Sequence, residues 1–237
     1  MPVENIECYL KLNERQRVKS EESQDHLAQH EAMLQWVKTP IAFNDLFKSR
    51  SLQPDGPKKE INKVLLIGEA GTGKTSLIKK IAHAWSVGEW GQEFHVVYLL
   101  PVRALRVDKY DNKGNYRTES TLPTAITNEC FTGTRTEQEF TALKNQVVVS
   151  LEQATTLVIL DGLDEQFGVS QNLLQEAKAG KHKLLLTSRP YGIETERSIV
   201  DIEVDNLGFN TEQRDNFINY VLADPPLSTR LISFIQA

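Results

Sequence analysis

Eight residues directly after an apolar run have the composition of a phosphate-binding loop. Residues 68–75 read GEAGTGKT, which satisfies the pattern G-x-x-x-x-G-K-[ST] in full. Glycines tolerate positive φ and carry no Cβ, so Gly68, Gly71 and Gly73 allow successive backbone N–H groups to turn inward around a polyphosphate. A predicted strand precedes the pattern and a predicted helix follows it, which is the context that a phosphate loop requires.

The side chains of this loop supply a charge and a metal ligand. We expect Lys74 to contact the β- and γ-phosphates of a nucleotide and the Thr75 hydroxyl to ligate Mg²⁺. The helix that begins near Lys74 adds the positive end of its dipole to the same point. The predicted nucleotide-binding residues are Gly68, Glu69, Ala70, Gly71, Thr72, Gly73, Lys74, Thr75 and Ser76.

An acidic cluster follows a second apolar run. Residues 156–165 read TLVILDGLDE, and the first carboxylate, Asp161, lies at the end of the run. At the C-terminal end of a neighbouring parallel strand it would face the same crevice as the phosphate loop, so we expect Asp161 to hold Mg²⁺ directly or through water. We favour Glu165 for orienting or deprotonating the attacking water, with Asp164 as the alternative.

A third apolar run ends in an arginine. The sequence LLLTSRP places Thr187, Ser188 and Arg189 at the end of this run, and Pro190 stops it. A guanidinium at a strand tip beside the γ-phosphate can bind the phosphate oxygens bidentately. We therefore expect Arg189 to sense whether the γ-phosphate is present.

Composition limits the partners of the chain. Its 237 residues include 27 Lys and Arg against 32 Asp and Glu, a formal net charge of -5. This balance argues against general attraction to nucleic acid or to anionic membranes, so phosphate binding must be local. No apolar run approaches the roughly 18 residues of a membrane span, and the N-terminus lacks a secretory pattern. Cys8 and Cys130 match no metal-ligand spacing, so we expect a reduced, cytoplasmic setting.

The elements that must position these residues alternate along the chain. We expect strands at residues 63–67, 95–100, 156–160, 183–187 and 199–204. Helical patterns lie between them at 74–85, 136–153 and 170–180; Thr136 and Glu139 form a capping box. This alternation predicts an α/β fold with a parallel five-stranded P-loop NTPase sheet and helices on both faces. Residues 106–120 are predicted to be an exposed insertion.

The two ends of the chain differ from its centre. Residues 1–60 are predicted to form an N-terminal helical and linker segment, with one amphipathic helix at 25–38 carrying Leu27, Met33, Leu34 and Val37 on one face. Prolines and a glycine at 51–60 mark a loop or boundary before the core at 61–206. Helical patterns without a further strand at 207–237 predict the beginning of a small helical subdomain.

Three segments resemble, in their order and spacing, the NACHT domains of the STAND class of signal-transducing P-loop ATPases. They are LLIGEAGTGKTSLIKKIAHAW, LVILDGLDE and LLLTSRP. The glycine after the first aspartate and the Asp-Glu pair that follows are the most discriminating part. GFN and the helical pattern at 208–220 also resemble the start of the helical subdomain that follows the NACHT core. The resemblance covers roughly residues 40–237.

This resemblance implies a signalling switch that binds ATP and hydrolyses it slowly with Mg²⁺. In NACHT domains, including those of NOD-like receptors of innate immunity, ADP holds a closed monomer, and exchange for ATP permits oligomerisation. The adenine preference comes from the resemblance alone. Family members carry an effector domain before this core and a winged helix and sensor repeats after it. We therefore expect the chain to be part of a larger protein that self-associates or contacts its missing C-terminal domains.

The same residues bear on other classes of P-loop protein. A GTPase would offer N-K-x-D and D-x-x-G, but NKGN at 112–115 lacks the aspartate and Asp164 stands where D-x-x-G needs glycine. An ABC-type signature is absent between the first two motifs. An AAA-type motor stays open because its arginine finger has no reliable local signature, as does a catalytically silent nucleotide-binding scaffold. The lysine pairs at 58–59 and 79–80 are too short to indicate nucleic-acid binding.

Overall fold

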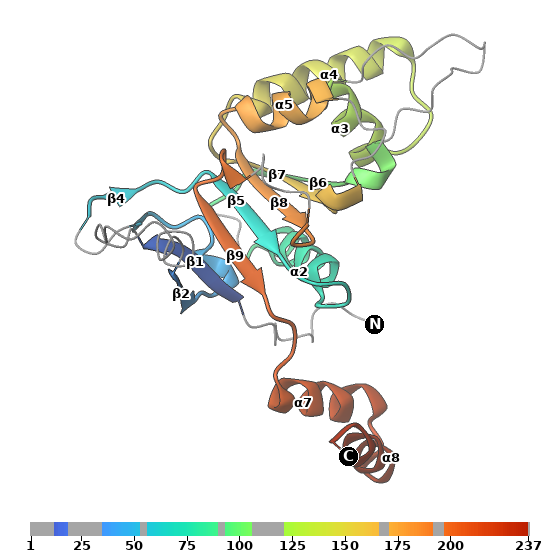
Figure 1. Ribbon diagram of the computed structural model, residues 1–237. Helices are drawn as coiled ribbons and strands as arrows, with labels where there is room; N and C mark the ends of the chain where they lie inside the picture. The colour runs from blue at the N-terminus through green and yellow to red at the C-terminus, as the bar shows by residue number, and fades with distance from the viewer. Residues whose placement is uncertain are drawn as a thin grey trace.

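The fold is built around one seven-stranded sheet (Figure 1). The computed structural model describes residues 12–18, 35–52, 56–89, 93–105, 121–165, 171–191 and 197–236. The strands of the sheet are β1 (Leu12–Val18), β2 (Gln35–Pro40), β5 (Lys63–Ile67), β6 (Val96–Pro101), β7 (Thr156–Asp161), β8 (Lys183–Ser188) and β9 (Ile202–Asn206). They lie in the order β2-β1-β9-β5-β8-β7-β6.

The five predicted strands form the parallel part of this sheet. Strands β9, β5, β8, β7 and β6 pair in parallel, each with the next. Their side chains alternate between the two faces: Leu65 and Ile67 belong to one buried cluster, whereas Val64 and Leu66 belong to the other. The prediction of a parallel five-stranded α/β sheet is confirmed.

Helices cover both faces of the sheet. They are α2 (Lys74–Ser86), α3 (Leu122–Cys130), α4 (Glu137–Leu151) and α5 (Gln171–Ala179), followed by α7 (Thr211–Leu222) and α8 (Pro225–Gln236). Helix α2 contributes Leu77, Ile78 and Ile81 to one buried cluster. Helices α3, α4 and α5 contribute to the cluster on the opposite face, as their position in Figure 1 also shows. Among the described residues, none of the helices has the length and apolarity needed to span a bilayer.

Helix α4 begins as the sequence predicts. The Thr136 side chain accepts a hydrogen bond from the backbone N–H of Glu139, and the Glu139 carboxylate accepts one from the N–H of Thr136 at 2.8 Å. These bonds satisfy two of the backbone donors that a helix start leaves without partners. Helix α3 has no counterpart among the predicted helices, and the insertion predicted at 106–120 lies outside the described residues.

One predicted neighbour relationship is wrong. Strand β7, which ends in Asp161, does not pair with β5, which precedes the phosphate loop, because β8 lies between them. All six residues of β8, Lys183–Ser188, are buried, which suits a central strand that pairs on both edges. The C-terminal ends of β5, β8 and β7 therefore lie side by side, and the tip of β8 lies between the phosphate loop and Asp161.

The helix predicted near the N-terminus is wrong where the structure describes it. Gln35–Pro40 form strand β2, which pairs antiparallel with β1, and β1 pairs antiparallel with β9. Trp36, Val37 and Thr39 are residue types that favour strands, and the free edge of β9 offers backbone partners to the segment. Residues 25–34 of the predicted helix lie outside the described residues.

Two smaller features complete the fold. The boundary stretch predicted at 51–60 begins at the second residue of β3 (Arg50–Ser51) and includes β4 (Lys58–Lys59). These two strands pair as a short antiparallel ladder. At the other end, the predicted helical patterns are confirmed as α7 and α8, which pack on each other and extend away from the sheet (Figure 1). Several large apolar side chains of α7 and α8 are exposed: Tyr220, Val221, Leu227, Leu231, Phe234 and Ile235.

Candidate functional site

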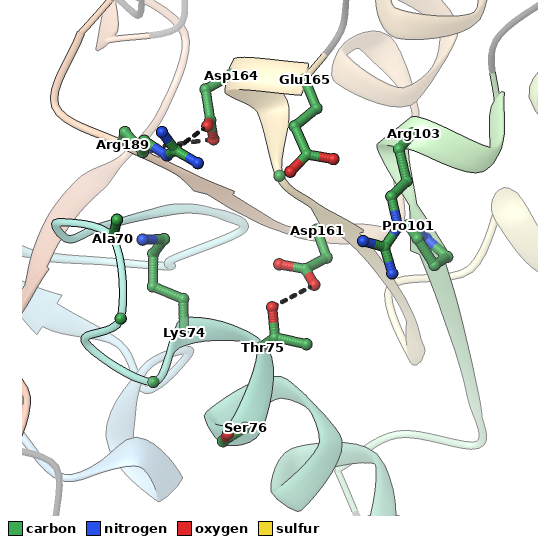
Figure 2. Close-up of a pocket in the computed structure, with 13 residues that line it drawn as sticks. Ala70, Lys74, Thr75, Ser76, Pro101, Arg103, Asp161, Asp164, Glu165 and Arg189 are labelled. Carbon is green, nitrogen blue, oxygen red and sulfur yellow. Dashed lines mark hydrogen bonds and ion pairs between the residues drawn. The ribbon is translucent and has the colours of Figure 1, made fainter.

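A polar cavity lies at the C-terminal ends of β5, β7 and β8. Its volume is about 400 Å³, and the phosphate loop, the acidic strand end of β7, the tip of β8 and the end of β6 contribute to it (Figure 2). The lining residues are Ala70, Gly71, Gly73, Lys74, Thr75, Ser76, Pro101, Arg103, Asp161, Gly162, Asp164, Glu165 and Arg189. Three cationic and three carboxylate side chains therefore face one cavity.

The glycines of the loop are required by its backbone. Gly71 and Gly73 have φ of 80° and 87°, in the left-handed region that favours glycine, and Gly73 caps the N-terminus of α2. Gly68 has no space for a side chain, since a Cβ there would lie 2.6 Å from Thr72 Oγ1 and 2.8 Å from the carbonyl oxygen of Asn206. The loop thus curls over the start of α2, where backbone N–H groups have no intrahelical partner.

The Lys74 ammonium is held by the loop itself. Its Nζ donates to the carbonyl oxygens of Gly68 at 2.5 Å and Glu69 at 2.9 Å. Burial lowers the pKa of Lys74, and nearby carboxylates, first of all Asp164, oppose this shift. This partly desolvated ammonium, whose acceptors among the described residues are carbonyl oxygens, would gain energy from an anionic ligand.

Asp161 is held by two hydroxyl groups. Its Oδ2 accepts a hydrogen bond from Thr75 Oγ1 at 2.9 Å, and its Oδ1 accepts one from Thr187 Oγ1 at 2.7 Å. A threonine hydroxyl beside a carboxylate is a hard oxygen donor set that suits Mg²⁺ when phosphate oxygens and water complete the shell. In the described part of the chain, no group of three or more His, Cys, Asp or Glu side chains could hold a metal ion. A bound Mg²⁺ would therefore depend on the nucleotide for part of its coordination.

Asp164 and Arg189 form an ion pair at the rim of the cavity. The Arg189 Nε lies 3.0 Å from Asp164 Oδ2, and the backbone N–H of Arg189 donates to Asp164 Oδ1 at 3.2 Å (Figure 2). The Arg189 side chain is about half exposed, at 52%, whereas that of Asp164 is at 18%. Both carboxylate oxygens of Asp164 are thus engaged by one residue.

Glu165 and Arg103 face the same cavity. Within the described residues, neither the Glu165 carboxylate nor the Arg103 guanidinium has a hydrogen-bond or ion-pair partner. In Figure 2, Arg103 lies on one side of Asp161, Lys74 and Arg189 lie on the other, and Glu165 lies above it. Arg103 comes from the short 3-10 turn Val102–Leu105 that follows β6. No motif in the sequence indicates Arg103; its place directly after a predicted strand is the only available signal.

The loop also contacts the chain segment that leads to α7. The end of β9 lies against Gly68, because the Asn206 carbonyl and Cβ approach the position of a Gly68 Cβ. Gly208, with φ of 72°, lies near Thr72: a Cβ on Gly208 would be 3.6 Å from Thr72 Cα, an ordinary van der Waals distance. The phosphate loop is therefore packed directly on the base of the C-terminal helices.

Comparison with known families agrees with this geometry. The family model described as NACHT domain matches residues 62–225, which is well over half of the chain. The chain belongs to the NACHT family. NACHT domains are nucleotide-binding P-loop NTPase domains, and the matched range includes every residue that lines the cavity.

Individual relatives of this NACHT domain include two curated proteins. The mouse protein "NACHT, LRR and PYD domains-containing protein 10" is 27% identical over 182 residues, covering 73% of this chain and 24% of the relative. The bovine "Nucleotide-binding oligomerization domain-containing protein 2" is 24% identical over 219 residues, covering 84% of this chain and 20% of the relative. The chain thus spans about a quarter or less of either relative. Among solved structures, that of C. elegans PCH-2 matches 68% of this chain and 39% of its own at 17% identity, with a TM-score of 0.44.

The NACHT cavity contains most of the residues that the sequence singles out. Of the predicted loop residues, Ala70, Gly71, Gly73, Lys74, Thr75 and Ser76 line it, as do Asp161, Asp164, Glu165 and Arg189. Gly68, Glu69 and Thr72 do not. Instead, the Glu69 carbonyl accepts hydrogen bonds from Lys74 Nζ and from Thr72 Oγ1, each at 2.9 Å. These three residues take part in the contacts that hold the loop together.

Proposed function

We propose that the chain is a nucleotide-controlled switch module that binds ATP with Mg²⁺ and hydrolyses it slowly to ADP and phosphate. The observation that carries the proposal is the 2.9 Å hydrogen bond between Thr75 and Asp161, which joins the phosphate loop to the acidic strand end inside one cavity. Arg189 and Glu165 face the same cavity. The adenine preference is an inference from NACHT family membership.

The proposed roles follow from the contacts. Backbone N–H groups of Gly71, Gly73 and Lys74 would bind phosphate oxygens, and Lys74 would exchange its carbonyl partners for the β- and γ-phosphates. Thr75 and Asp161 would hold Mg²⁺, which supplies charge neutralisation on the phosphates when bound. Glu165, whose carboxylate is free within the described residues, would orient the attacking water and accept its proton.

The contacts that Arg189 and Lys74 already make are consistent with slow turnover. Arg189 is paired with Asp164, and Lys74 is hydrogen-bonded to loop carbonyls. Both side chains must therefore change partners before they can stabilise the charge of a transferring phosphoryl group. A site that depends on such a rearrangement is better suited to holding one state than to rapid cycling.

Self-association is the second part of the proposal. The name of the bovine relative describes a nucleotide-binding oligomerization domain, and the exposed apolar side chains of α7 and α8 provide surface that a neighbouring domain or subunit could cover. We propose that the nucleotide state controls this surface through the segment that links β9 to α7, and that the protein works in the cytoplasm.

Nucleotide binding can be tested directly. Protein purified without added nucleotide is denatured, and the released compounds are identified by chromatography. Bound ADP supports the switch, bound GDP favours a GTPase, and the absence of any nucleotide together with no calorimetric binding of ATP or ADP contradicts the proposal. Replacing Lys74 with alanine should weaken ATP binding about 10-fold or more, because a charge-assisted contact is lost. Lys79→Ala, the same change on an exposed part of α2, is the matched control.

A further inference from the structure

One buried hydroxyl group links the acidic strand end to the middle of the sheet. Thr187, on β8, is fully buried, and its Oγ1 donates to Asp161 Oδ1 at 2.7 Å. The same oxygen accepts the backbone N–H of Gly162 at 2.9 Å. A threonine hydroxyl has one proton to donate, so both its donor and an acceptor position are used by the residues at the tip of β7.

The position of β8 makes this contact possible. Because β8 lies between β5 and β7, Thr187 is beside Leu66 of the strand that leads into the phosphate loop and next to the end of the strand that carries Asp161. Gly162 has φ of 85°, a conformation that favours glycine. Its amide closes the contact with Thr187, so the backbone after Asp161 is held as well as the carboxylate.

We infer that Thr187 is the positioning residue of the metal-binding carboxylate. Its hydroxyl fixes the rotation of the Asp161 carboxylate, so that Oδ1 faces the sheet and Oδ2 faces Thr75. The metal-ligand pair is thereby arranged before any ligand enters. This inference rests on the proposed function and goes beyond it, because Thr187 does not line the cavity and would touch neither metal nor nucleotide.

Loss of a residue that orients the metal ligand should change the affinity for Mg²⁺ but not the affinity for nucleotide without metal. Loss of a purely structural residue would change both. Loss of the hydroxyl leaves Asp161 Oδ1 without its donor and the Gly162 amide without its acceptor, so the carboxylate can rotate. Residues that orient a metal ligand typically change metal affinity about 10- to 100-fold. Among the described residues, the Thr187 hydroxyl bonds to Asp161 and Gly162 and to no residue of the phosphate loop, so nucleotide affinity without metal should stay unchanged.

The test compares T187V, T187S and wild type in binding a fluorescent, non-hydrolysable ATP analogue, first in EDTA and then as Mg²⁺ is added. T187V should bind the analogue normally in EDTA but need about tenfold more Mg²⁺ for half-maximal enhancement. T187S, which keeps the hydroxyl, should behave like wild type. The matched control is T156V: Thr156 is also fully buried, and its Oγ1 donates to the Ser150 carbonyl at 2.7 Å from the first residue of β7. Its Mg²⁺ requirement should not change.

Each outcome decides the question. An unchanged Mg²⁺ midpoint in T187V, or an equal loss of binding with and without metal, would overturn the role of Thr187 and leave the proposed function intact. Absence of nucleotide binding by wild type at every Mg²⁺ concentration would overturn both. Should T187V fail to fold by circular dichroism, T187A also removes the hydroxyl donor, and a wild-type midpoint in that variant would refute the inference in the same way.

Discussion

Arg189 engages both carboxylate oxygens of Asp164, one through its side chain at 3.0 Å and one through its backbone N–H at 3.2 Å. The proposed γ-phosphate sensor is therefore held at the rim of the cavity by an acidic neighbour. An incoming triphosphate would compete with Asp164 for the guanidinium. This competition makes the pair a natural point of discrimination between ATP and ADP, because the two nucleotides differ only in the phosphate that would replace Asp164.

We predict that Arg189→Ala weakens ATP binding about tenfold and ADP binding much less, since only ATP would gain the bidentate contact. Calorimetric titration of both nucleotides measures the ratio. Arg230→Ala, which removes an exposed arginine of α8, should leave both affinities unchanged. Equal losses for ATP and ADP in the Arg189 variant would rule out a γ-phosphate sensor.

The two adjacent carboxylates should behave differently. Glu165→Gln should leave ATP binding unchanged and lower hydrolysis by about 100-fold or more, the scale of a general base. Asp164→Asn should weaken the hold on Arg189 and affect hydrolysis less. Phosphate release under single-turnover conditions measures both. If hydrolysis survives in Glu165→Gln but is lost in Asp164→Asn, the roles of the two residues are reversed.

Arg103 is expected to contribute a second guanidinium to the nucleotide. It lines the cavity and has no ion-pair partner among the described residues. Arg103→Ala should therefore weaken ATP binding about tenfold, whereas Arg103→Lys, which keeps the charge but not the planar fork, should recover only part of the loss. Wild-type ATP affinity in the alanine variant would show that this side chain stays in solvent.

Gly68 should tolerate no side chain. A Cβ would lie 2.8 Å from the backbone oxygen of Asn206, which cannot move aside as a side chain can. We predict that Gly68→Ala lowers the free energy of unfolding by about 1–3 kcal/mol, as overpacking does, and weakens nucleotide binding. Urea denaturation measures the first effect. Adding Thr72→Ala removes the second close contact, at 2.6 Å, but not the one with Asn206, so stability should return only in part.

The Cys130 thiol should react slowly. Burial raises its pKa to about 11, above the ordinary value near 9.0. The thiolate is the nucleophile, and it is scarce at neutral pH. In a Cys8→Ser background, iodoacetamide should alkylate folded protein far more slowly than urea-unfolded protein at pH 7.5, and the folded rate should still be rising at pH 9. Equal rates for folded and unfolded protein would contradict this assignment.

The sequence predicts the residues that meet in the cavity better than it predicts how they are brought there. The phosphate loop, Asp161 and Arg189 are recognisable because glycine spacing and a charge at the end of an apolar run are local patterns. The strand order is not local: the length and apolarity of β7 and β8 do not reveal which of them lies beside β5. The contact of Thr187 with Asp161 depends on that order and stays hidden until it is known.

The prediction for the N-terminal region is wrong for a related reason. Leu27, Met33, Leu34 and Val37 have helical spacing, yet Val37 belongs to β2, whose pairing with β1 at the edge of β9 outweighs the local pattern. Arg103 carries no pattern at all, because its place in the cavity follows from the turn after β6 and not from its neighbours in sequence. Only the fold brings it into the cavity.

The close packing of Gly208 on Thr72 and of Asn206 on Gly68 has a mechanical consequence. If the chain is the proposed switch, a shift of the loop would be passed to the stem of the helical pair α7–α8, because little space separates the two. A small tilt of the stem would become a larger displacement at the far end of α8. The rim of the cavity would then be the pivot of the helical pair.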